Sequence, residues 1–364
     1  MSVVPDSLHP TRGRIVEERD DIVVRQVTEG AAIHHHPFFF VNAWDREMTF
    51  LVLVSHRTGR PQIWLEWQET GALVQLTDDP ALAEWSVIPS KDGRWIYFVS
   101  GQEGKRVSPR DGSVEVLVAF GGAEMREAGM VGAAMGTTAL SASGRYWAVP
   151  VKTGGVSRFW MIDTGRGTAD VFLESPTIGH PQFCPDDDDL ILYAGPMTDR
   201  VWVTDRAGNR RRIFERRHDM QWITHEVWRP GHRSVLFVDW PNGMGEIDVD
   251  TGAVGTVTGF PVWHGAPDPG GRRLVCDTNF PDRGLFALDL DGVSVPRFLH
   301  APGASSQGAH WAHPFPYNDG PVTVHAPQHT HPHPRFSPDG RQVVFTSDRT
   351  GHAQVYVATL RDTG

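Results

Sequence analysis

The sequence predicts an all-β fold, a seven-bladed β-propeller built as one domain over residues 1–364. Three observations predict it. The chain shows almost no helical periodicity, and short β-branched and aromatic runs alternate with Gly, Asp and Pro turns. One unit, an apolar strand followed by a tight turn and a second strand, also recurs along the whole chain.

The repeat is clearest near the end of the chain, in PRFSPDGRQVVFTSD (residues 334–348). Weaker copies lie at residues 38–55, 88–100, 140–151, 181–195, 226–240 and 265–278. A period of ~40–50 residues with several strands per unit is typical of propeller blades. The alternative is a pair of stacked β-sandwich domains, but the even spacing, with no linker of different composition, favours the propeller.

The ends of the chain predict how the ring closes. Residues 352–360 have the pattern of a third strand of the last blade, and residues 21–29 are expected to supply its fourth strand. Closing the ring in this way removes an open sheet edge. The one long interval between repeats contains an insertion, about 301–328, that is rich in Gly, Pro and His. It is expected to be a long loop, and such loops are often functional.

Composition excludes several classes of partner. The net charge of −10 argues against non-specific nucleic-acid binding, and an anionic substrate would need a local positive centre. Cys184 and Cys276 are far apart in the sequence, so no disulfide is expected. No apolar leader and no stretch of ~18 apolar residues is present. We therefore expect a cytoplasmic protein that contacts neither membranes nor nucleic acids.

Histidines occur in register with the repeat. His180, His225, His264 and His333 each enter the predicted inner strand of one of four blades. Residues at this position converge on one end of the propeller axis, so we expect these side chains to lie close together although they are distant in sequence.

The motif QHTHPHP predicts a metal site. His331 and His333 share one face of an extended segment that Pro332 stiffens, and Gln328 can add an amide oxygen. His264 from the preceding blade would complete four protein ligands for a divalent transition metal. Zinc, iron and nickel fit this set equally well, and the remaining positions would be open to water or substrate.

Other histidines have simpler interpretations. An isolated His-Pro-His could be a solvated loop, and His180 could either line the pocket and contact the substrate or be a core histidine satisfied by the backbone. The consecutive His34, His35 and His36 cannot all face one site and are expected at the surface or the channel rim. The insertion's histidines are expected to be loop residues: His310, His313, His325 and His329.

A set of motifs distributed over nearly the whole chain points to one known family: TGALVQLTD, GHPQFCPDDDD, RVW, THEVW, WHGAPDPGG and QHTHPHPRFSPDGRQVVFTSDRTG. On these motifs the chain resembles the oligogalacturonate lyases, cytoplasmic seven-bladed propellers of pectin breakdown. The resemblance implies that His264, Gln328, His331 and His333 hold a manganese ion. It further implies that His225 is the Brønsted base and that Arg200 contacts the substrate carboxylate, in a β-elimination that cleaves short oligogalacturonides.

The chain also departs from the family pattern. Pro-Gly-Ala-Ser-Ser (302–306) replaces Asp-Thr-Ser-Trp, the loop at 193–199 lacks the expected acidic residue, and the first blade carries HHHPFFF. These changes fall where the resemblance places substrate subsites. Two other functions stay open, a non-catalytic propeller that binds a partner and a metal-dependent enzyme acting on a different uronate.

Overall fold

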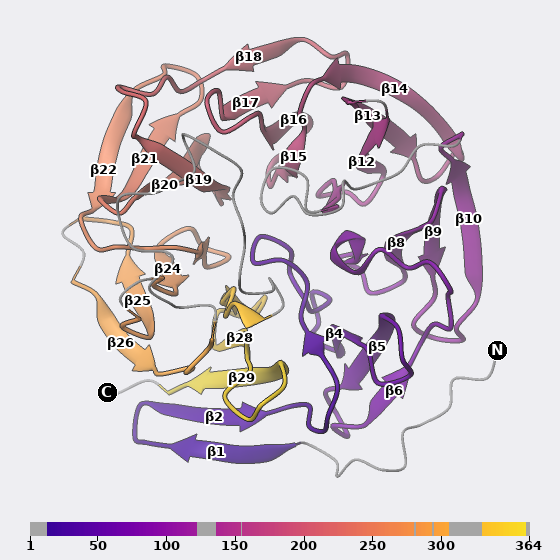
Figure 1. The fold of residues 1–364 in the computed structure, drawn as a ribbon, viewed down its shortest axis with the longest axis vertical. Coiled ribbons are helices and arrows are strands. Elements are labelled where there is room, and N and C mark those ends of the chain that lie inside the picture. The colour runs from indigo at the N-terminus through magenta and orange to yellow at the C-terminus, as the bar shows by residue number, and fades with distance from the viewer. Residues whose placement is uncertain are drawn as a thin grey trace.

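The computed structural model describes residues 13–121, 136–153, 155–279, 282–292, 295–305 and 330–361. In this part of the chain the regular elements are antiparallel strands and one short 3₁₀ helix, η1 (Glu84–Ser86). Seven sheets stand around a common centre like the blades of a fan (Figure 1). The predicted all-β, seven-bladed propeller is therefore confirmed.

Each sheet runs outward from an inner strand near the centre to a peripheral one. The strands of the first three blades are β3 (His34–His35), β4 (Phe50–Ser55), β5 (Gln62–Trp67) and β6 (Leu73–Gln75); β7 (Ile88–Pro89), β8 (Ile96–Ser100), β9 (Glu103–Val107) and β10 (Val114–Ala119); and β11 (Ala139–Leu140), β12 (Tyr146–Thr153), β13 (Val156–Asp163) and β14 (Thr168–Ser175). Those of the next three are β15 (Gly179–Cys184), β16 (Asp187–Ala194), β17 (Val201–Thr204) and β18 (Arg210–Arg212); β19 (Trp222–Arg229), β20 (Ser234–Trp240), β21 (Gly243–Asp248) and β22 (Val254–Thr258); and β23 (Gly265–Pro267), β24 (Arg273–Cys276), β25 (Leu285–Asp289) and β26 (Arg297–His300).

The last blade joins the two ends of the chain. It contains β27 (Arg335–Phe336), β28 (Gln342–Ser347) and β29 (Gln354–Leu360), followed outward by β2 (Ile22–Gln26) and β1 (Arg14–Glu18). The antiparallel pairing of β2 with β29 confirms the predicted closure by residues 21–29. The outermost strand β1 was not predicted, because three of its five residues are charged and none of the five is fully buried, so its sequence lacks a clear strand pattern.

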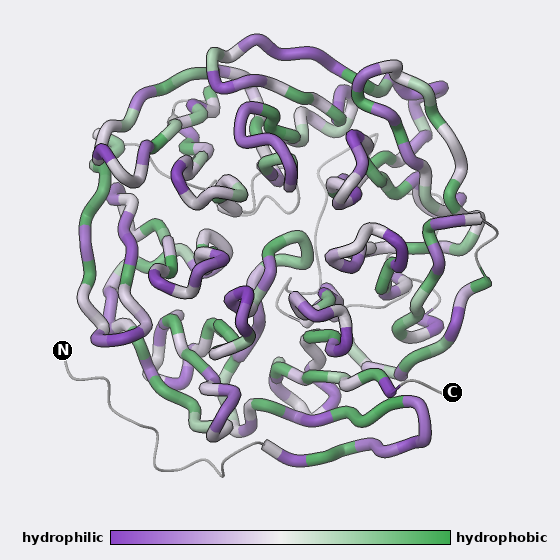
Figure 2. The backbone as a smooth tube through the Cα atoms, turned by 180° about the vertical axis from the view of Figure 1, so that it is seen from behind, coloured by the Kyte–Doolittle hydropathy of each residue, from purple (hydrophilic) through white to green (hydrophobic). Residues whose placement is uncertain are grey.

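Burial follows the position of a strand within its blade. Every residue of the inner strand β19 is buried, whereas in the peripheral β10 the side chains of Val114 and Val116 are about half exposed. Figure 2 shows the same ring from behind, with hydrophobic and hydrophilic positions mixed along the peripheral strands. Cys184 and Cys276 are buried free thiols, as expected. No helix in the described ranges is long and apolar enough to cross a membrane.

Candidate metal and catalytic centre

The inner strands bring the four histidines into one structural register. In the fifth, sixth and seventh blades a backbone hydrogen bond closes the turn after the inner strand. The carbonyl groups that accept these bonds belong to Arg229, Asp268 and Ser337, respectively. His225, His264 and His333 each lie four residues before the accepting residue of the same blade, and His180 lies four before Cys184, which pairs with Asp187 across the turn of its own blade. The sixth blade's turn is completed by Gly271, with φ of +64°.

This register places the imidazole rings side by side. The ring centroids are 6.3 Å apart for His180 and His225, 4.3 Å for His225 and His264, and 4.1 Å for His264 and His333. All four residues are buried. Side chains from four blades thus form one continuous cluster, as the sequence register predicted.

Three of the predicted metal ligands converge. His264, His331 and His333 each offer one ligand nitrogen, and these nitrogens lie within 4.8 Å of one another. The rings of His331 and His333 are nearly parallel, 5.4 Å apart, as expected for alternate residues of an extended segment. The buried Nε2 of His333 has no hydrogen-bond partner among the described residues. Gln328, the fourth predicted ligand, lies outside the described residues.

An unusual backbone conformation aims these side chains. His180, His225 and His333 have φ values of +47°, +51° and +47°, in the left-handed region that non-glycine residues rarely adopt. In β15 and β19 the strand register also shifts around His180 and His225, which is the signature of a β-bulge. Such conformations cost ~1–3 kcal/mol each and cluster at functional sites. The same strained conformation in three blades directs three histidines into one cluster.

Asp277 fixes the orientation of His264. Its Oδ2 lies 2.8 Å from Nδ1 of His264, and its Oδ1 accepts the backbone N–H of the same residue at 2.7 Å. The backbone N–H of His333 also points to Oδ2, at 3.3 Å. A carboxylate on one ring nitrogen leaves the other, Nε2, to face a metal. Sequence reasoning missed Asp277, since it lies one strand away from the repeat position that marks the histidines.

Burial determines how this pair is charged. It raises the pKa of the Asp277 carboxyl well above its usual value and lowers the pKa of the His264 imidazole. Burial therefore disfavours two separate full charges on this pair.

His225 has the features of a general base. Its Nδ1 lies 2.6 Å from the backbone carbonyl oxygen of Trp263, and because a carbonyl only accepts, Nδ1 must carry the proton. Nε2 is then the nitrogen with a free lone pair. Burial, followed by the nearby His264 and Arg200, lowers the pKa of His225 well below its ordinary value of 6.5. The ring is therefore neutral and able to accept a proton at neutral pH.

Arg200 lies beside this base in a buried polar network. Its Nε donates to Oε1 of Glu226 at 2.8 Å, and its Nη2 donates to Nδ1 of His180 at 3.2 Å. Both members of the Arg200–Glu226 ion pair are almost completely buried. His180 therefore positions the guanidinium. Sequence analysis missed Glu226 as a partner although it is the next residue after His225.

Aromatic side chains cover the cluster. Phe38 lies 4.7 Å from His333 between ring centroids, and Phe39 lies 5.5 Å from His225 and 5.3 Å from His264. The indigo chain before β4 reaches the centre of the ring in Figure 1, consistent with these contacts. The apolar FFF run therefore forms a wall against the candidate site.

The expectation for the three consecutive histidines was wrong in one respect. His34, His35 and His36 are each only 1% exposed and so do not lie at the surface. His34 and His35 form the inner strand β3, and His36 extends it so that its Nε2 lies 3.2 Å from the carbonyl oxygen of Pro332. The polar character of the run suggested a surface, but an inner strand near the axis is buried by neighbouring blades.

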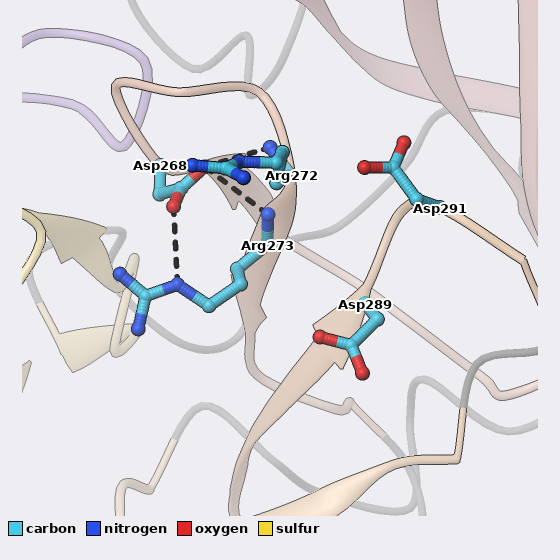
Figure 3. A pocket seen from close by; sticks show the side chains of 5 residues that line it. All are labelled: Asp268, Arg272, Arg273, Asp289 and Asp291. Atoms are coloured by element: carbon cyan, nitrogen blue, oxygen red, sulfur yellow. Dashed lines mark hydrogen bonds and ion pairs between the residues drawn. The ribbon is translucent and has the colours of Figure 1, made fainter. Parts of the chain in front are cut away.

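A separate pocket of about 400 Å³ lies at the other end of the sixth blade's inner strand. It is lined by Asp268, Arg272, Arg273, Asp289 and Asp291 (Figure 3). Asp268 uses its carboxylate to hold the turn, accepting two backbone amides and the Nε of Arg273. The carboxylate of Asp268 thus stabilises the turn. None of the predicted site residues lines this pocket.

The chain was compared with protein-family models and with curated proteins, and its curated relatives are oligogalacturonate lyases. No family model matches the chain. The chain is 28% identical over 222 residues to an oligogalacturonate lyase of Dickeya dadantii, and 27% identical over 222 residues to an oligogalacturonide lyase of Pectobacterium atrosepticum. Each match covers 56% of this chain and 56% of the relative, so the chain spans about half the length of the curated relatives it matches.

Solved structures extend the likeness to the whole fold. An oligogalacturonate lyase in complex with manganese superposes with a TM-score of 0.81 at 21% identity, covering 100% of this chain and 99% of that one. An oligogalacturonate lyase from Vibrio parahaemolyticus gives 0.75 at 19% identity, with coverages of 100% and 98%. The chain thus resembles the oligogalacturonate lyases in sequence over about half its length and in propeller fold over all of it.

Proposed function

We propose that this protein is a metal-dependent lyase that cleaves oligogalacturonides by β-elimination, with manganese as its cation. The observation that carries the proposal is the convergence of His264, His331 and His333 beside His225, whose Nε2 is free to accept a proton. The similarity to oligogalacturonate lyases supports the substrate class.

The donor set fits a divalent cation. Asp277 turns Nε2 of His264 away from itself, and the buried Nε2 of His333 has no hydrogen-bond partner in the described part of the chain. With His331, and with Gln328 as the predicted fourth ligand, these residues would hold the ion. When bound, it would neutralise the substrate carboxylate and stabilise the enolate-like charge of the elimination. Manganese is chosen because a solved relative is described with it, since imidazole donors alone suit several metals.

The proposed chemistry begins at His225. Its Nε2 accepts the proton on the carbon next to the uronate carboxylate, and the carbonyl of Trp263 stabilises the resulting imidazolium through Nδ1–H. The electron pair of the broken C–H bond forms a C=C bond, while the neighbouring C–O bond breaks. The leaving oxygen takes the electron pair of the broken C–O bond and a proton from water, which gives an unsaturated uronate at the new end.

Arg200 supplies permanent positive charge beside the base. We propose that its guanidinium binds the substrate carboxylate or the developing negative charge through charge-assisted hydrogen bonds. His180 and Glu226 hold it in place from two blades. Phe38 packs on His333 and Phe39 on His225, so these two aromatic rings would form one wall of the proposed substrate site.

The proposal is tested with the full chain on digalacturonate and a panel of other uronate oligomers. The ultraviolet absorbance of an unsaturated uronate should appear with manganese and should be absent after chelation. His331→Ala should lose both the Mn²⁺ held at the His264, His331 and His333 cluster and turnover. An active His331→Ala protein without metal would contradict the proposal. If the protein binds metal but forms no product from digalacturonate, its substrate is a different uronate.

A further inference from the structure

A second group of metal-type donors lies between the first two blades. His35 belongs to the inner strand β3, and His56 directly follows β4 of the same blade. Glu84 belongs to η1, which precedes β7 of the next blade. One donor atom from each of the three residues lies within 4.8 Å of the others. Two imidazoles and a carboxylate from two blades therefore converge at the blade interface.

The distances in this group are close to those of a coordination shell. Nε2 of His35 lies 3.5 Å from Oε2 of Glu84, and Nε2 of His56 lies 2.7 Å from the same oxygen. Metal–donor bonds of ~2.0–2.2 Å place tetrahedral ligands roughly 3.4 Å apart. The His35–Glu84 distance already matches, and the His56–Glu84 hydrogen bond needs to open by less than an ångström, with the cation replacing its proton.

The hydrogen bonding of His35 leaves one of its ring nitrogens directed at Glu84. Its Nδ1 lies 3.0 Å from the backbone carbonyl oxygen of His36, so Nδ1 donates a proton there. Nε2 is therefore the ring nitrogen that faces Glu84, and within the described ranges this buried atom has only the 3.5 Å ion-pair contact with Oε2 of Glu84. A cation between Nε2 of His35 and Oε2 of Glu84 would coordinate both atoms.

The surroundings hold His35 still and leave a path for an ion. The ring of His35 packs on Trp85 with centroids 4.2 Å apart, and Trp85 in turn lies 6.0 Å from His333. Trp85 thus separates this group from the first histidine cluster. The side chains of His56 and Glu84 are 25% and 17% exposed, so an ion can enter from solvent.

We propose that His35, His56 and Glu84 form a second divalent-metal site that links the first two blades. Two nitrogen donors and one oxygen donor suit a borderline cation such as Zn²⁺, with water in the remaining position. The site does not depend on the proposed lyase activity, because it shares no ligand with the first cluster.

The test measures Zn²⁺ binding to the full, chelator-treated chain by elemental analysis and calorimetry. His331→Ala weakens the first centre, and His331→Ala/His56→Ala removes a ligand of the second as well. We expect the single variant to keep one tightly bound Zn²⁺ and the double variant to lose it. The loss in affinity should exceed the ~10–100-fold change typical of substitutions outside the ligand shell. Zn²⁺ should also raise the melting temperature of the single variant only.

Two further variants make the test specific. Glu84→Gln in the His331→Ala background should weaken Zn²⁺ binding as His56→Ala does, whereas the exposed His232→Ala should leave it unchanged. Equal Zn²⁺ affinity and stoichiometry in His331→Ala and His331→Ala/His56→Ala would overturn the proposal. So would the absence of Zn²⁺ binding in His331→Ala, since a proton on His35 would then supply the positive charge beside Glu84.

Discussion

The carboxylate of Asp277 lies 2.8 Å from Nδ1 of His264 and also accepts the backbone N–H of that residue. The same carboxylate faces the backbone N–H of His333 at 3.3 Å. One buried side chain therefore fixes a ring and two backbone segments that come from neighbouring blades. The arrangement is that of an outer carboxylate that orients a metal-binding histidine.

Asp277→Asn should weaken metal binding without removing a ligand. The amide keeps the shape of the carboxylate but loses its charge, so His264 becomes a poorer donor. We expect about 10–100-fold weaker Mn²⁺ affinity by calorimetry. Asp289→Asn, an exposed carboxylate in the same blade, is the matched control and should bind like the wild type. Unchanged affinity in Asp277→Asn would show that the contact serves only to pack the blade.

His225→Ala should separate catalysis from metal binding. Because His225 is the proposed base and not a ligand, kcat/KM should fall ~10²–10⁴-fold while the Mn²⁺ stoichiometry stays the same. His232→Ala, at an exposed position in the turn of the same blade, is the control. Turnover retained in His225→Ala would remove this residue from the base role.

The buried pair of Arg200 and Glu226 predicts a stability coupling. Arg200→Ala leaves the Glu226 carboxylate buried without its partner, which should cost about 3–5 kcal/mol of unfolding free energy. Arg200→Ala/Glu226→Ala should recover part of that loss in urea unfolding. The half-exposed pair of Arg158 and Glu174 is the comparison, and Arg158→Ala there should cost less than about 1 kcal/mol. Additive losses in the buried pair would argue against a direct interaction.

His36 predicts a loss of stability in acid. Burial lowers the pKa of His36 from 6.5 to about 4, opposed by its hydrogen bond to the carbonyl of Pro332. The folded state therefore keeps the ring neutral at pH values where the unfolded chain binds a proton. The stabilisation is complete above pH 6.5 and decreases as the pH falls toward about 4, by roughly 3 kcal/mol in all.

His36→Gln provides the comparison for this effect, because glutamine can still donate to the Pro332 carbonyl but does not titrate. Urea unfolding of the metal-free proteins between pH 7 and pH 4 should show a steeper loss for the wild type than for the variant. Parallel curves would mean that His36 has the same pKa in the folded and unfolded states.

Much of the fold followed from the sequence because a propeller repeats one local pattern. The turn glycines and the β-branched runs marked the blades, and the final strand of residues 354–360 required a partner that only residues 22–26 could supply. The polar outer strand β1 carried no such signal. Repetition also located His225, His264 and His333, since equivalent positions in different blades converge on the axis.

The remaining site residues follow from contacts between blades, which leave no periodic mark in the sequence. Asp277 is recognisable only once His264 is seen beside it, and Glu226 only once Arg200 is placed. The burial of His34, His35 and His36 was missed for the same reason. Neighbouring blades enclose this polar run, and the sequence alone does not show that contact.

The account depends most directly on a metal at the His264, His331 and His333 cluster acting on a uronate. The decisive measurement is the ultraviolet absorbance produced from digalacturonate by the full chain, first after chelation and then after Mn²⁺ is restored. We predict no product in the first state and an unsaturated uronate in the second. Equal product formation in both states would contradict the account.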